Sequence, residues 1–327
     1  MTSAYYGKRE KLYLDDLHWA IIKASHILHS NGIFDAYGHV SVRNPDNLSN
    51  FLMPRNLPPA LLQSADDIVE YKTDDAEPVE KDTPAGFAER AIHSEIYKKF
   101  PGVNAIVHAH STDVLPFTIS EVPLKACIHT AGFLGKIPPV WDIASAYSSS
   151  DKKDLLVRTA TLGHSYAASF KPETSTGFLY QKMKAALPTT IGGGTPDPST
   201  VPDHPVVLMR GHGFTSTADS LEAAVYQAIY TAEAAEVQLN AITIHDAHFG
   251  RTVEGQVDVG EHGSGKIKSA KVKTEGKIKY LSDKEVGDAW AFSRDTMMRP
   301  WALWCREVEV SPLYKCDVKK EEEGDGK

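Results

Sequence analysis

The chain has 327 residues, of which 42% are hydrophobic, which is enough for one extended domain or for one domain with an appendage. Acidic residues outnumber basic ones by 43 to 35, and the net charge of −8 argues against a nucleic-acid partner. The sequence shows no membrane span, no apolar signal-peptide core and no cysteine spacing typical of disulfides or metal binding, so we expect a soluble, cytoplasmic protein.

The first third of the chain alternates between helical and extended patterns. Apolar residues at helical spacing predict a helix over 15–31, and a strand, a turn and a second strand follow within 38–53. Thr83 as a cap, with proline directly after it, predicts a helix over 84–100. The apolar run VNAIVHAH at 103–110 then predicts a buried strand.

The middle of the chain is less regular. Residues 121–143 resemble a strand, a glycine-containing loop and a second strand, and 171–187 has a helical pattern. The Gly/Pro/Ser/Thr stretch at 188–204 is too long for an ordinary connection, which indicates a mobile lid or a tolerated insertion.

Further on, PVVLM at 205–209 predicts a strand that leads into RGHG. Asp219 and Glu222 form a capping box at the start of a long helix, and a tryptophan-rich helical segment covers 282–309. The alternation of helix and strand favours a three-layer α/β/α domain. We therefore divide the chain into an N-terminal arm (1–14), a catalytic domain (15–249, with a flexible insertion at 188–204), a C-terminal appendage (250–315) and a charged tail (316–327).

Two histidines at the end of a predicted strand are the first candidates for chemistry. His108 and His110 are two residues apart, so on a strand both imidazoles point to the same face, as a pair of metal ligands would. His212 is the natural third ligand, because it follows an apolar strand and lies between Gly211 and Gly213. Taken alone, His212 could equally be a loop histidine.

Glu89 is the second candidate. In the predicted helix it lies on the apolar stripe that ends at Phe100, whereas Glu95 projects to the other side. A carboxylate on a buried stripe is costly unless it is paired or bound to a metal, so Glu89 is either an acid/base residue or the partner of a buried arginine. His93, one turn on, either orients Glu89 or fills space.

The sequence contains the motifs GHVSVR (38–43), ERAIHSEIYKKFPGVNAIVHAHS (89–111), AGFLGKIP (131–138) and RGHG (210–213). Together these motifs resemble the class II aldolase/adducin superfamily, and the resemblance covers residues 15–245. The resemblance implies a three-layer α/β/α domain with a central, largely antiparallel sheet. It also implies that His108, His110 and His212 hold a metal, and that Glu89 is the acid/base residue beside it.

The chain departs from the sugar-phosphate aldolases of this family at their phosphate site. Those enzymes use an asparagine in a GN[VIL]S turn and two serines before the catalytic glutamate, where this chain has His39, Phe87 and Ala88. A phosphate would lose its amide and hydroxyl donors there, so we interpret His39 and Phe87 as contacts to a different substrate. The tyrosine acid of the aldolases falls near Cys127, which makes His129, two residues on, a second candidate catalytic residue.

The pattern GHVSVR, FLMPRN, ERxIHxEIY and HTAGFLG is most similar to the decarboxylase-like branch, which includes decarboxylases of hydroxylated aromatic dicarboxylates. The resemblance implies a metal-dependent lyase that decarboxylates a hydroxylated aromatic, cyclic or oxo acid through a metal-stabilised enolate. Glu89 or His129 would protonate the carbanion. Arg55 would bind a substrate carboxylate, unless it is merely an exposed loop residue.

Two other interpretations stay open. One is an aldolase or epimerase acting on a non-phosphorylated hydroxy-carbonyl compound, and the other is a non-catalytic, adducin-like interaction protein. The adducin branch typically lacks the metal histidines that this chain has. We expect one divalent ion per subunit, with Zn²⁺ favoured and Mn²⁺ or Co²⁺ suited to the same ligands. By similarity to the family, we also expect a small-molecule acid substrate and a homotetramer.

Overall fold

The computed structural model describes residues 14–135, 137–170, 201–250 and 276–318. In these residues the centre of the fold is a seven-stranded sheet with the strand order β3-β2-β1-β4-β7-β6-β5. All neighbouring strands pair antiparallel, apart from the parallel pair β5 and β6. The strands are β1 (His39–Arg43), β2 (Asn50–Pro54), β3 (Ile68–Lys72), β4 (Ala105–Ala109), β5 (Val140–Trp141), β6 (Val206–Met209) and β7 (Gly213–Ala218).

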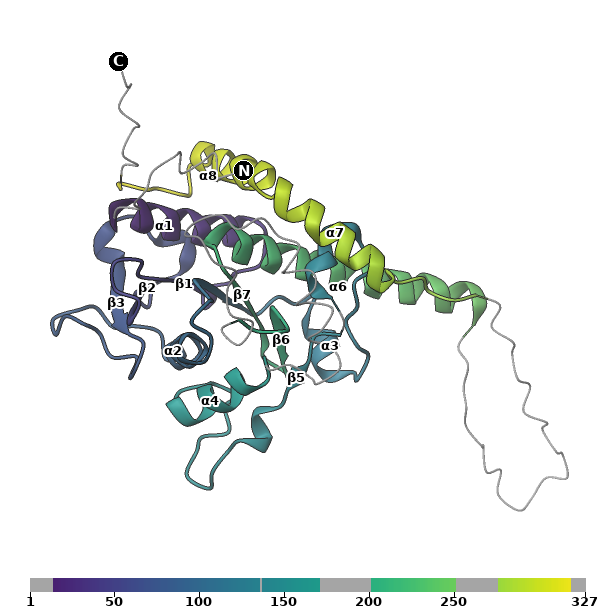
Figure 1. Cartoon of the computed structure of the whole chain (residues 1–327), viewed down its shortest axis with the longest axis horizontal. Coiled ribbons are helices and arrows are strands. Elements are labelled where there is room, and N and C mark those ends of the chain that lie inside the picture. Colours follow the sequence, from purple (N-terminus) through teal and green to yellow (C-terminus); the bar gives the residue numbers. More distant parts are fainter. Residues whose placement is uncertain (1–13, 136, 171–200, 251–275, 319–327) are drawn as a thin grey trace, which may run out of the picture.

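Helices cover both faces of this sheet, so the expected three-layer α/β/α fold is confirmed. Figure 1 shows α1 and α8 on one side and α2 and α4 on the other. The α-helices are α1 (Leu14–Ser30), α2 (Arg90–Lys99), α3 (Leu115–Ile119), α4 (Ala160–Ala168), α6 (Leu221–Phe249), α7 (Asp283–Thr296) and α8 (Met298–Val310), and the 3₁₀ helices are η1 (Pro59–Leu61), η2 (Ala65–Asp67), η3 (His129–Leu134) and η4 (Ile143–Ser145).

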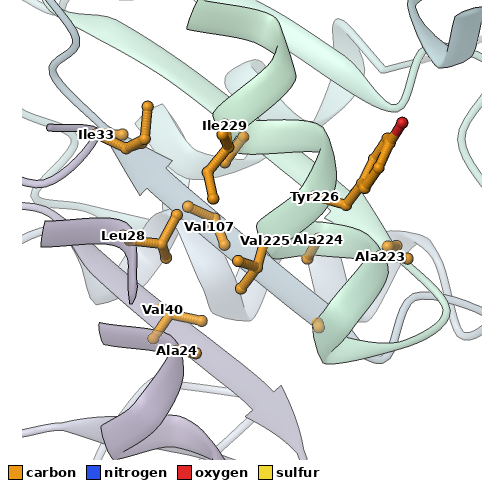
Figure 2. Packing of buried hydrophobic residues seen from close by; sticks show 14 of the residues in the cluster. Ala24, Leu28, Ile33, Val40, Val107, Ala223, Ala224, Val225, Tyr226 and Ile229 are labelled. Carbon is orange, nitrogen blue, oxygen red and sulfur yellow. The ribbon is translucent and has the colours of Figure 1, made fainter. Parts of the chain in front are cut away.

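The alternation of side chains along β4 separates two hydrophobic cores. Val107 packs into the larger core with α1 and α6, and Figure 2 shows it among Leu28, Val40 and Val225. Ile106, one residue earlier, points to the opposite face and packs with α2 and α4. His108 is two residues after Ile106, so its side chain points to the same face, which α2 and α4 cover.

The C-terminal helices α7 and α8 join the larger core. Trp290, Trp301 and Trp304 are all buried in it, and an ion pair of 2.9 Å between Arg294 and Asp219 connects α7 to the residues before α6. These tryptophans are therefore packing residues within the subunit.

The predicted helix over 84–100 begins later than expected, because α2 starts at Arg90. Residues 84–89 are not helical, and Gly86 forms a β-bridge with Arg55. A Cβ on Gly86 would lie 2.1 Å from the hydroxyl of Tyr71, so this segment packs against the sheet too closely for a helix. Glu89 consequently takes the N-cap position of α2.

Three further expectations were wrong. Glu95 is buried, because α4 covers the outer face of α2 so closely that a Cβ on Gly163 would lie 2.8 Å from Cγ of Glu95. The cap of α6 is Ser220, whose side chain accepts a hydrogen bond from the backbone N–H of Ala223. Residues 121–128 form no strand, and the second predicted strand there is only the two-residue β5.

No helix in the described ranges is long and apolar enough to cross a membrane. The helix predicted over 171–187, most of the predicted insertion at 188–204, and most of the predicted arm and tail lie outside the described residues. Residues 201–204, at the end of the predicted insertion, are buried.

Candidate metal centre

The end of β4 supplies two imidazoles. His108 is the fourth residue of β4 and His110 follows the strand directly, so both side chains lie on the α2/α4 face. Strand pairing puts His108 between His39 of β1 and Thr215 of β7. The structure brings the two imidazoles together, with Nε2 of His108 3.1 Å from Nε2 of His110.

The turn between β6 and β7 supplies the third imidazole. Gly211 has a φ of +63°, a backbone conformation that favours glycine, and His212 comes next. Gly213 then begins β7 so close to β4 that a Cβ on it would lie 2.1 Å from the carbonyl oxygen of Ala109. This close approach brings Nε2 of His212 to 3.2 Å from Nε2 of His110.

Glu89 adds a carboxylate from the start of α2. Its Oε1 accepts a hydrogen bond of 2.8 Å from the backbone N–H of Val157. Its Oε2 lies 3.3 Å from Nε2 of His212 and 3.8 Å from Nε2 of His108. One oxygen is therefore held by the backbone while the other faces the histidines.

These four groups fit a divalent ion. One ligand atom from each of Glu89, His108, His110 and His212 can be chosen so that all four lie within 4.8 Å of one another. A tetrahedral ion with metal–nitrogen bonds of about 2.0–2.1 Å separates its ligands by about 3.3–3.4 Å. The Nε2 separations of 3.1 and 3.2 Å are close to that value. Three imidazoles and one carboxylate suit Zn²⁺, Mn²⁺ or Co²⁺.

The surroundings favour the form of histidine that binds metals. Nδ1 of His108 hydrogen-bonds Oγ1 of Thr215 at 3.1 Å, and Nδ1 of His110 lies 3.4 Å from a carboxylate oxygen of Asp35. Such outer partners leave the Nε2 lone pairs free for the ion. Burial, and then the neighbouring imidazoles, hold the pKa of His108 well below its ordinary value, and burial with His212 lowers the pKa of His110. Both imidazoles are therefore neutral, as metal ligands must be.

His39 and Phe87 form a wall beside these groups. The ring of His39 lies 5.0 Å from that of His108 and 4.7 Å from that of Phe87. Burial, followed by the charges of neighbouring histidines, lowers the pKa of His39 well below its usual value, so the ring is neutral. His93 does not orient Glu89, because its Nε2 lies 2.8 Å from Nδ1 of His39.

Arg55 follows β2 directly, and one of its side-chain nitrogens is hydrogen-bonded to Asp67. Its Nε donates a hydrogen bond of 2.8 Å to Oδ1 of Asp67, and 37% of its side chain is exposed. Although burial alone would raise the pKa of Asp67, hydrogen bonds from Ser64, Gln63 and Arg55 lower it. Asp67 therefore fixes the direction of the Arg55 guanidinium. The two terminal nitrogens of Arg55 have no hydrogen-bond partner among the described residues.

His129 lies elsewhere in the subunit. It begins η3, is exposed, and lines a cavity of about 230 Å³ whose other walls come from α6, α7 and α8. Tyr226 and Tyr230 form the aromatic side of that cavity, and the hydroxyl of Tyr226 donates to the carbonyl of Thr130. Across the described ranges, the candidate metal ligands do not include His129.

Thr215 and Asp35 were not predicted from the sequence. Thr215 lies on the same sheet face as His108 because β7 pairs with β4 in that register. The alternation in GFTSTA after the glycine turn is a signal that could have revealed a hairpin with Thr215 on the site face. No comparable signal marks Asp35, which comes from the loop after α1.

Comparison with known families agrees with this arrangement. Residues 20–239 match the model of the class II aldolase and adducin N-terminal domain, so the chain belongs to this family. It is 39% identical over 293 residues to the decarboxylase tropJ of Talaromyces stipitatus, covering 90% of this chain and 94% of that protein. It is 28% identical to the 3,4-dihydroxyphthalate decarboxylase of Arthrobacter keyseri, covering 64% of this chain and 72% of that protein. These relatives support lyase activity.

Solved structures show the same fold. The L-fuculose 1-phosphate aldolase of Glaciozyma antarctica superposes with a TM-score of 0.58 at 16% identity, covering 95% of this chain and 99% of the aldolase. An aldolase II superfamily protein from Pseudomonas syringae gives a TM-score of 0.58 at 16% identity, covering 93% and 97% of the two chains.

Proposed function

We propose that this protein is a metal-dependent carboxy-lyase that removes CO₂ from a hydroxylated aromatic or cyclic acid, or from an oxo acid. The observation that carries the proposal is the wall formed by His39 and Phe87 beside the metal ligand His108. This wall offers an aromatic face for a ring and no hydroxyl or amide donors for a phosphate. The identity to decarboxylase tropJ over most of both chains supports the same interpretation.

Each residue of the site has a separate role in this proposal. His108, His110 and His212 would hold one divalent ion, with Zn²⁺ favoured, and the carboxyl group of Glu89 would lie beside the ion as the acid/base group. When bound, the ion supplies Lewis-acid polarisation of a substrate oxygen. Phe87 packs against the substrate ring. As CO₂ leaves, the electrons of the broken C–C bond stay on the substrate carbon, which then takes a proton from Glu89, and Glu89 recovers a proton from water.

Arg55 is the proposed partner of a second substrate carboxylate. The register of β1 and β2, in which Val42 pairs with Leu52, places Arg55 across from His39 if it is continued. His39 in turn pairs with His108, so the continued register would place Cα of Arg55 about two strand spacings, roughly 10 Å, from Cα of His108. The two terminal nitrogens of Arg55 match the planar fork of a carboxylate.

His129 is the alternative proton donor. It would have to reach the metal centre of a second subunit, because in its own subunit it lines the cavity beside α6, α7 and α8. We propose a homotetramer in which His129 is placed at a subunit boundary. Light scattering should give a mass near four times 35.8 kDa. A monomer at the concentration used for assays would exclude His129 as the alternative proton donor.

The test of the reaction is a substrate panel. It should contain hydroxylated phthalates, 2-oxo acids, non-phosphorylated hydroxy-carbonyl compounds and fuculose- or ribulose-type phosphates, with CO₂ trapping and product mass as readouts. We expect loss of 44 Da from a hydroxylated or oxo acid. Release of an aldehyde without loss of CO₂ would favour an aldolase instead, and purified protein without a divalent metal or any turnover would favour an adducin-like interaction protein.

A further inference from the structure

A chain of four hydrogen-bonding groups leads from α2 to the metal centre. The hydroxyl of Tyr97 lies 2.8 Å from Oγ of Ser41, which lies 2.6 Å from Nδ1 of His93. Nε2 of His93 lies 2.8 Å from Nδ1 of His39. All four side chains belong to residues that are 2% exposed or less, so the groups have to satisfy one another rather than bulk water.

The direction of these hydrogen bonds follows from the number of protons available. The hydroxyl of Tyr97 has one proton, and Ser41 is its hydrogen-bond partner in the part of the chain that the structure describes. A buried hydroxyl has to donate, so Tyr97 donates to Ser41, and Ser41 gives its own proton to Nδ1 of His93. Because a buried, unpaired charge is costly, His93 is neutral, with its proton on Nε2, and donates to Nδ1 of His39.

The last hydrogen bond defines the state of His39. Since its Nδ1 accepts, the neutral ring has its proton on Nε2. We propose that Tyr97, Ser41 and His93 are positioning residues that hold His39 in this one tautomer, so that it offers an N–H donor to an oxygen atom of the substrate. The identity of that substrate rests on the proposed function, whereas the tautomer rests on the hydrogen bonds alone.

Packing restricts rotation of the rings of His93 and Tyr97. Phe51 stacks on His93, with ring centroids 6.4 Å apart and planes 13° apart, and it also lies 5.4 Å from the ring of Tyr97. The guanidinium of Arg43 covers the ring of Tyr97 at 4.6 Å. In the reversed arrangement the proton of Tyr97 would have no acceptor, which favours the inferred direction by about tenfold or more in population.

A fixed N–H donor makes the site selective. It favours a carboxylate, carbonyl or phenolate oxygen at this position and disfavours an amino group, because an ammonium or amide N–H would meet another donor. Aromatic acids with an oxygen substituent next to the carboxylate satisfy this requirement.

The tautomer can be observed directly in the full-length, zinc-loaded protein. Two-bond ¹H–¹⁵N correlation on ¹⁵N-histidine-labelled protein, or neutron diffraction, should find the proton of His39 on Nε2. The variant Ser41→Ala should give a mixture of tautomers, and Ser41→Thr, which keeps the hydroxyl, should restore the single form. Ser25→Ala is the matched control, because it removes a buried serine hydroxyl that donates to the carbonyl of Ile21 in α1.

The functional readout is the separation of KM from kcat with 3,4-dihydroxyphthalate as the probe, or its dissociation constant if it is bound but not turned over. Ser41→Ala should raise KM or Kd in inverse proportion to the fraction of His39 that keeps its proton on Nε2, which is about twofold for equal tautomer populations. Its zinc content should match that of Ser25→Ala. A proton on Nδ1 of His39 in the wild-type protein, or a single unchanged tautomer in Ser41→Ala, would overturn the inference. If His39 has the predicted tautomer but no acid loses CO₂, the proposed function fails and the inference stands.

Discussion

Replacing Gly213 with alanine tests whether the metal centre depends on the close approach of β4 and β7. The added Cβ would lie 2.1 Å from the carbonyl oxygen of Ala109 and 3.1 Å from Cα of His110, whereas ordinary contact begins near 3.4 Å. The two strand ends would have to separate by about 1.3 Å, since both obstacles are backbone atoms. Metal–ligand distances tolerate only about 0.2 Å, so Gly213→Ala should lower zinc affinity about a hundredfold.

The assay is competition for Zn²⁺ against a chromophoric chelator, with a melting curve recorded alongside. Overpacking should lower the free energy of unfolding by about 1–3 kcal/mol. Gly250→Ala is the control for the added methyl group, because no atom lies within 4 Å of the Cβ position of Gly250, although its φ of +79°, unlike that of Gly213, disfavours alanine. It should strain the backbone and leave zinc affinity unchanged. A folded Gly213→Ala protein that binds zinc as tightly as the wild type would refute this account of the centre.

Three further outcomes are expected. His110→Ala, or dialysis against a chelator, should abolish turnover while circular dichroism shows a folded protein, and active protein without metal would contradict this. Glu89→Gln should lower turnover by about a hundredfold with zinc retained by elemental analysis, and near-wild-type turnover would make Glu89 structural. Burial lowers the pKa of His26 from 6.5 to about 4, so the unfolded chain binds more protons between these values. As the pH falls through this window, His26 should lower the free energy of unfolding by about 3 kcal/mol. The urea-unfolding curves of His26→Asn should show correspondingly weaker pH dependence.

Local patterns predicted the parts of the site that a single element determines. The spacing of His108 and His110 was sufficient to put both on one face, because a strand has a period of two wherever it lies in a sheet. The glycines around His212 likewise indicated a tight turn. That these two regions meet depended on resemblance to the family, since nothing local shows that β4 pairs with β7.

The parts that were missed depend on packing between elements. A helical stripe correctly predicted a buried Glu89 but for the wrong reason, because residues 84–89 are not helical, Gly86 bridges to Arg55, and Glu89 is the N-cap of α2. The same helical projection predicted that Glu95 is exposed, but α4 covers Glu95 and it is buried. Such contacts arise from segments far apart in the sequence, so the period of one helix cannot reveal them.

The centre is built on one row of residues across the sheet. His39 pairs with His108, and His108 pairs with Thr215, so neighbouring strands place a proposed substrate donor, a metal ligand and the partner of that ligand side by side on one face. Directly paired residues of antiparallel strands lie about 5 Å apart, which explains why these contacts need no loop to adjust them. A slip of one residue in either pairing would turn the row to the opposite face, where α1 and α6 form the larger core. The burial of that core therefore fixes the strand register, and the register in turn aligns the groups of the site.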